Sequence, residues 1–100
     1  MPTLHVDLRE GFSRDTVVVR IDGREVFRRS GVETNYSVGL ADRITVELPE
    51  GEVRVEVRLP DRGIQHTIVH QVSGPATLAF VLDQAGTLSG SEVEASPRYL

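Results

Sequence analysis

The sequence predicts an all-β protein: an antiparallel β-sandwich of the immunoglobulin-like or prealbumin-like kind, with seven to eight short strands and no substantial helix. Apolar and polar residues alternate with a period of two in several segments, most clearly over residues 43–59. Turn residues separate these segments roughly every 8–12 positions, which is typical of sandwiches and barrels. No segment places apolar residues at the i, i+3, i+4 and i+7 spacing of an amphipathic helix. The irregular strand set favours a sandwich over a barrel.

The composition fits one globular domain. Of 100 residues, 39% are hydrophobic and 26% are charged, a balance typical of folded proteins. We expect a single domain over residues 1–100, with residues 95–100 as a C-terminal tail. The formal net charge of −4 argues against a nucleic-acid partner and gives no reason to expect binding to an anionic membrane.

The expected location is the cytoplasm. The chain has no cysteine, which favours a reducing compartment and removes thiol nucleophiles and cysteine-based zinc sites. Its first residues lack the basic region and apolar run of a signal peptide. No apolar segment approaches the ~20 residues that span a bilayer.

The chain begins with a predicted strand and loop. Residues 3–9 alternate, with His5 and Asp7 on the polar side of the strand. Residues 10–15 are polar and contain Gly11, so they are expected to form a loop.

A hairpin is expected next. Residues 16–22 are rich in β-branched side chains, and Asp22-Gly23 favours a tight turn because both positions accept positive φ. Residues 25–29 form the return strand, with Arg20 opposite Glu25 and Val18 opposite Phe27. Ser30-Gly31 should end this strand, and residues 33–40 allow one further short strand.

Residues 43–59 predict a second hairpin, half buried. Its tip is Glu50-Gly51, and its core face carries Ile44, Val46, Leu48, Val53, Val55, Val57 and Leu59. This register places Glu47 opposite Arg54 and Arg43 opposite Arg58, with Glu56 diagonal to Arg43.

Three more strands follow. Residues 60–63 form a type I turn that ends in glycine, and residues 64–72 form a long strand. Residues 77–82 carry no charge, so they predict either a central strand buried on both faces or one face of an interface. After a turn at residues 83–86, residues 87–94 predict a weak last strand.

Two segments resemble a known group of sandwich domains. Leu48-Pro49-Glu50-Gly51, the strand Val53–Val57 and then Gly63 resemble the core motif of prealbumin-like, carboxypeptidase-regulatory-like and PEGA-type domains. Residues 19–26 are similar to a PEGA-type segment. The usual aromatic after the turn glycine is absent, with Val53 near its place. The resemblance covers about half of the chain and implies an accessory binding or structural module without catalytic residues.

His66 and His70 are the first candidate site. Four residues of strand span roughly 13 Å, which is too far for two ligands of one metal ion. If the turn at residues 60–63 keeps register, the two imidazoles face Val57 and Val53, whereas a bulge at Gly63 would turn them outward. A partly polar strand face, a metal site shared with His5 or a second subunit, and a pH-sensitive interface remain open.

No catalytic motif is present, so the expected protein is not an enzyme and has no cofactor or metal. No nucleophile elbow and no calcium-loop spacing occur in the sequence. The acidic residues are expected at turn tips or on solvated strand faces. An enzyme with a dispersed site is the third hypothesis on function.

All eleven basic residues are arginine. Arg28-Arg29, with Arg14, Arg20 and Arg24, predicts either an edge strand protected by charge or a surface for an acidic partner.

The tail is the candidate partner-binding segment. Arg98, Tyr99 and Leu100 combine a charge, an aromatic ring and an aliphatic side chain with a terminal carboxylate. They are expected either to pack locally or fray, or to dock in a groove of a partner or sister subunit.

The leading functional hypothesis is a non-enzymatic interaction or structural module. It is expected to bind a protein partner or to self-associate through an edge strand or an apolar sheet face. A small-ligand or carbohydrate-binding sandwich is the alternative, although sugar platforms usually use exposed aromatic residues and this chain has no tryptophan.

Overall fold

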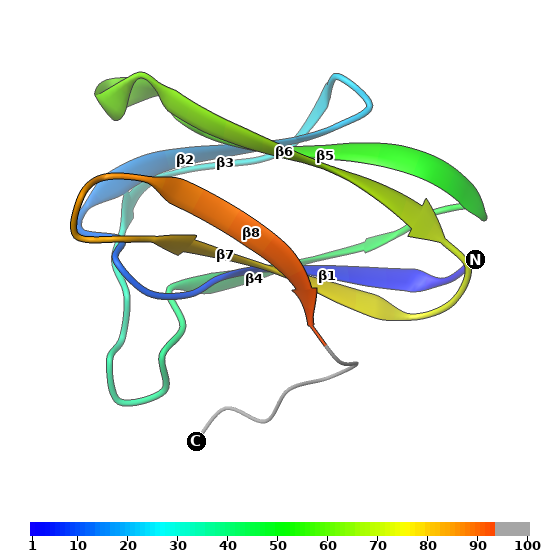
Figure 1. Cartoon of the computed structure of the whole chain (residues 1–100), viewed down its shortest axis with the longest axis horizontal. Helices are drawn as coiled ribbons and strands as arrows, with labels where there is room; N and C mark the ends of the chain where they lie inside the picture. The colour runs from blue at the N-terminus through cyan, green and yellow to red at the C-terminus, as the bar shows by residue number, and fades with distance from the viewer. Residues whose placement is uncertain (94–100) are drawn as a thin grey trace.

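Two four-stranded sheets pack face to face (Figure 1), and this arrangement confirms the predicted all-β sandwich. The computed structural model describes residues 1–93. The first sheet has the order β4 (Asp42–Glu47), β1 (Thr3–Leu8), β7 (Ala76–Leu82), β8 (Leu88–Val93). The second has the order β3 (Arg24–Val32), β2 (Asp15–Ile21), β5 (Gly51–Leu59), β6 (Ile64–Val72). Within residues 1–93, the helical structure is one 3-10 turn, Pro60–Arg62.

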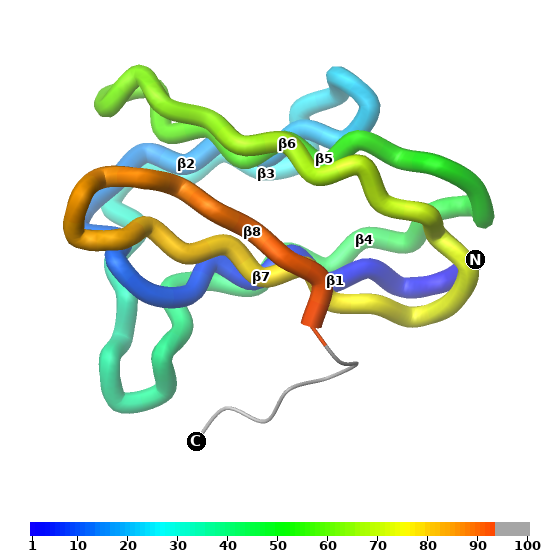
Figure 2. The backbone as a smooth tube through the Cα atoms, in the orientation of Figure 1, coloured from blue at the N-terminus to red at the C-terminus, as the bar shows by residue number. Residues whose placement is uncertain are grey.

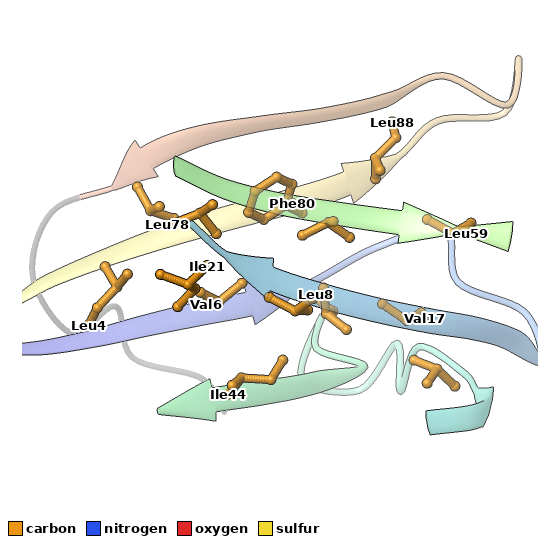
Figure 3. Close-up of a cluster of buried hydrophobic side chains, with 14 of the residues drawn as sticks. Leu4, Val6, Leu8, Val17, Ile21, Ile44, Leu59, Leu78, Phe80 and Leu88 are labelled. Carbon is orange, nitrogen blue, oxygen red and sulfur yellow. The ribbon is translucent and has the colours of Figure 1, made fainter. Parts of the chain in front are cut away.

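The core lies between the two sheets. Figure 3 shows part of this cluster, with Leu4, Val6, Leu8, Leu78 and Phe80 from the first sheet and Val17, Ile21 and Leu59 from the second. These side chains are almost completely buried because period-two alternation turns one apolar row of each strand inward.

The uncharged segment at residues 77–82 is a central strand, as predicted. It forms β7, which lies between β1 and β8, and all but one of its residues are buried. Its pairing with β1 is parallel, with Leu4 beside Ala76 and Leu8 beside Phe80. The expected antiparallel arrangement therefore holds for every other strand pair of the described chain but not for this one. Parallel neighbours need a long connection, and most of the chain separates β1 from β7.

The predicted hairpin over residues 43–59 is wrong. β4 pairs with β1 in the first sheet, whereas β5 pairs with β2 and β6 in the second. The segment Leu48–Glu50 crosses from one sheet to the other, and Pro49 has no N–H to offer a ladder. The inward face was identified correctly, because Ile44, Val55 and their alternate neighbours point into the core. Alternation fixes which face is buried, but not which strand lies alongside.

The hairpin at Asp22-Gly23 is present, with φ of 51° and 82° at its two central residues. The expected pair Arg20–Glu25 forms, but Phe27 lies opposite Val19 instead of Val18. The register shifts by one residue between Val19 and Arg20. This bulge leaves Val18 opposite Arg28, on the same outer face of the sheet as Arg20.

The following segment differs from expectation in two ways. β3 continues through Ser30-Gly31 to Val32, with a second register irregularity near Asp15. Residues 33–40 form no strand beyond a single bridge between Asn35 and Leu40. They form a loop that projects from the sandwich (Figure 2).

Two aspartates predicted in solvated or loop positions are buried. Asp7 is 0% exposed and accepts two hydrogen bonds from Arg43, at 2.7 and 3.0 Å. Asp15 accepts two from Arg62, at 2.6 and 3.2 Å. Buried carboxylates require such paired donors. The second pair anchors the turn Pro60–Arg62 to the start of β2.

Candidate functional site

The strand predicted at residues 64–72 is β6, and its histidines face inward. His66 pairs with Val57 and His70 with Val53, as expected for a turn that keeps register. The ring of His66 contacts Phe80 edge-on, with 6.2 Å between centroids. His70 is 6% exposed, and its Nδ1 lies 3.4 Å from Glu92 Oε1 on β8.

The three histidines do not converge. His5 lies on β1, and its Nδ1 is 2.9 Å from Thr45 Oγ1 on β4. Among residues 1–93, no three His, Asp or Glu side chains are arranged to hold a metal ion. The predicted partner-binding residues Arg98, Tyr99 and Leu100 lie outside the described residues.

The outer face of the second sheet carries an ordered grid of polar side chains. Because paired residues of adjacent strands share a face, one row across β3, β2, β5 and β6 is Arg28, Val18, Arg58 and Gln65. The next row is Glu25, Arg20, Glu56 and Thr67. Acidic and basic side chains therefore alternate around Arg20.

Val18 forms the apolar floor of this surface. It is only 2% exposed although it lies on the outer face, because the neighbouring arginines lie on either side of it. A pocket of about 370 Å³ opens above it, lined by Val18, Arg20, Arg28, Arg58, Pro60, Gly63, Ile64 and Gln65.

Two of the three arginines in the pocket have fixed partners. Arg28 donates from Nε and Nη2 to Glu25, the shortest bond being 2.9 Å. These hydrogen bonds hold the pKa of Glu25 below its ordinary value and raise that of Arg28. Arg58 Nε donates to Gln65 Oε1 at 2.9 Å and lies 3.5 Å from Glu56 Oε2.

Arg20 differs from its two neighbours. Its Nε is buried and has no hydrogen-bond partner. A buried donor without a partner costs about 1–3 kcal/mol and calls for an explanation. The sequence analysis grouped Arg20 and Arg28 with Arg14, Arg24 and Arg29. It did not include Arg58 in this group, because only the strand order shows that β5 lies beside β2 and that Arg58 therefore lies opposite Val18.

The four edge strands differ in how they are protected. β3 carries Arg24, Glu25, Arg28 and Arg29 and has two register irregularities. β4 carries Asp42, Arg43 and Glu47, and the short β8 carries Glu92. In contrast, β6 has nine residues without Lys, Arg, Asp, Glu, Pro or Gly, and it pairs with β5 in unbroken register.

The outward side chains of β6 are Gln65, Thr67, Val69 and Gln71. All four are exposed, Val69 to 53%. A long, regular and uncharged edge is the kind that pairs with another strand.

Aromatic residues do not form a binding platform in the described part of the chain. Phe12 and Phe80 are buried and Phe27 is half buried. Tyr36, in the projecting loop, is 70% exposed. No helix of residues 1–93 is long and apolar enough to cross a membrane.

Comparison with known proteins adds no relative: no family model, curated protein or solved structure matches this chain. The resemblance to prealbumin-like and PEGA-type domains therefore stays a prediction.

Proposed function

We propose that this protein is a non-enzymatic interaction module that self-associates through the edge of β6. The observation that carries this proposal is the contrast between β6 and the other three edges. β3, β4 and β8 bear charges or irregular pairing that oppose the approach of another strand. β6 bears neither.

The occupant of this edge is a second copy of β6. In an antiparallel pair about a two-fold axis, the outward side chains of one strand lie beside those of the other. Gln65, Thr67, Val69 and Gln71 are all uncharged, so no register brings like charges of this row together. Alternate N–H and C=O groups of β6 supply the hydrogen bonds, and the two second sheets join into one.

Thr67→Lys tests the proposal. It adds a charge at the centre of the outward row, where a two-fold partner would place a second lysine nearby, and charged edges of this kind prevent strand addition. We expect wild-type protein at micromolar to millimolar concentration to shift from the 11.0 kDa mass of one chain toward twice that mass. The variant should stay at the mass of one chain in sedimentation equilibrium.

Ser89→Lys is the matched control, because Ser89 is exposed on the β8 edge. It should associate like the wild type. A wild-type protein that keeps the mass of one chain throughout this range, or equal loss of association in both variants, would contradict the role of β6.

A further inference from the structure

We infer that the pocket over Val18 binds a carboxylate carried on an apolar body, through Arg20. The pocket combines an apolar floor with one arginine, Arg20, whose buried Nε lacks a hydrogen-bond partner. The pocket is formed within one chain, although it shares Gln65 with the β6 edge.

Arg20 is the arginine of the pocket whose Nε has no hydrogen-bond partner. Arg28 is held by Glu25, and Arg58 by Gln65 and Glu56. Among the described residues, no carboxylate oxygen lies within 4.0 Å of the guanidinium nitrogens of Arg20, although its charge acts on the Glu25 carboxylate opposite it. Its Nε is shielded from water, so a ligand would reach the Nη groups. A carboxylate is the acceptor that matches a guanidinium through two parallel N–H···O bonds.

The net charge around the pocket favours a ligand with one negative charge. The guanidinium groups of Arg20, Arg28 and Arg58 outnumber the neighbouring carboxylates of Glu25 and Glu56 by one. A monoanion neutralises this excess, whereas a phosphate dianion would leave a negative surplus beside Glu56.

The rest of the pocket favours an apolar body. Pro60 and Ile64 supply aliphatic surface beside the guanidinium groups, above the almost fully buried Val18. The turn that contributes Pro60 is held in place by the ion pair between Arg62 and Asp15, at 2.6 Å. A ring of the size of benzene fits a volume of about 370 Å³ with its carboxylate toward Arg20.

Benzoate is a suitable probe, followed by the NMR shifts of the Val18 and Gln65 amides and the arginine Nε–H groups. We expect saturable shifts with benzoate and much weaker ones with uncharged benzamide or with inorganic phosphate. Arg20→Gln should raise the dissociation constant for benzoate about tenfold or more, as expected for a lost charge-assisted pair.

Arg54→Gln is the matched control, because Arg54 is exposed on β5, carries the same charge and does not line the pocket. It should leave benzoate binding unchanged. Gln65→Glu is a second test that keeps Arg20: the new carboxylate at the rim removes the charge excess and should also weaken benzoate binding.

No saturable shifts with the wild type, or equal losses in Arg20→Gln and Arg54→Gln, would overturn the inference. Phosphate binding as tight as benzoate binding would overturn the preference for a carboxylate. The unfolding midpoint of each variant shows whether the fold is intact, and the Gln65→Glu result decides the question if Arg20→Gln is unfolded.

Discussion

At the scale of single residues, arginine side chains form much of the outer face of the second sheet. Val18 is buried there because Arg20, Arg28 and Arg58 surround it, and not because it faces the core. Long arginine side chains can cover apolar surface with their aliphatic stems, and these three line one pocket together with the valine. An arginine truncated at this surface would therefore expose apolar surface in addition to removing a charge.

The pair Arg28–Glu25 gives a prediction about pH. Arg28 hydrogen bonds lower the pKa of Glu25 in the folded protein. Since the folded pKa lies below the unfolded value of about 4.3, the pair stabilises the fold above that value, and this stabilisation is lost as the pH falls through the lowered pKa. An NMR titration should give a Glu25 pKa below the ordinary value, and Arg28→Gln should return it toward that value. An unchanged Glu25 pKa in the variant would show that the hydrogen bonds do not form in solution.

Residue patterns alone could not identify the buried acids. Asp7 follows the polar spacing of a strand and Asp15 was expected in a loop, whereas in the fold each is buried and paired with an arginine from a distant segment. The partners Arg43 and Arg62 are separated from them by 36 and 47 positions. Such pairing depends on which strands are neighbours, and this is tertiary information.

At the scale of elements, Gly90 sets the distance between β8 and the opposite sheet. β6 and β8 run past each other at one side of the sandwich (Figure 2), and His70 of β6 approaches Glu92 of β8. A side chain at position 90 would place Cβ 2.7 Å from the ring of Phe80 and 2.9 Å from Ile68 Cδ1. Both distances are shorter than van der Waals contact.

Gly90→Ala should therefore destabilise the protein by about 1–3 kcal/mol, the usual cost of overpacking a core. The Phe80 ring is fully buried and cannot move aside freely. Gly74→Ala is the control, because a Cβ there meets nothing within 4 Å. Urea unfolding should show a lower midpoint for Gly90→Ala alone, and equal midpoints would contradict the close approach of β8.

Strand positions were predicted better than strand partners. The predicted strands at residues 3–9, 64–72 and 77–82 correspond closely to β1, β6 and β7, because period-two alternation and uncharged composition are local signals. The pairing of β4 and β5 was wrong. Both strands have one apolar face, and this property suits two strands of one sheet and two strands of facing sheets equally well.

The candidate site depended on the same missing information. The arginines of β2 and β3 could be grouped from the sequence, since a tight hairpin joins these strands. Arg58 and Gln65 entered the pocket only because β5 lies beside β2 and β6 lies beside β5. The sequence shows that residues 64–72 carry no Lys, Arg, Asp or Glu. It does not show that the strand they form lies at the edge of a sheet.

At the scale of the whole molecule, self-association should couple to stability. A partner that binds only the folded chain raises the midpoint of thermal unfolding as its concentration rises. We therefore expect the Tm of the wild type to increase with protein concentration and that of Thr67→Lys to stay constant. The same dependence in both proteins would place the contact elsewhere on the surface.

The position of β1 in the middle of the first sheet affects the order in which the molecule can be completed during synthesis. β1 leaves the ribosome first, yet its neighbours are β4 and β7, and β7 ends at Leu82. All four strands of the second sheet are present once Val72 has emerged. The first sheet can therefore be completed only after all strands of the second are available, because β7 must pair with β1 and β8 must then pair with β7.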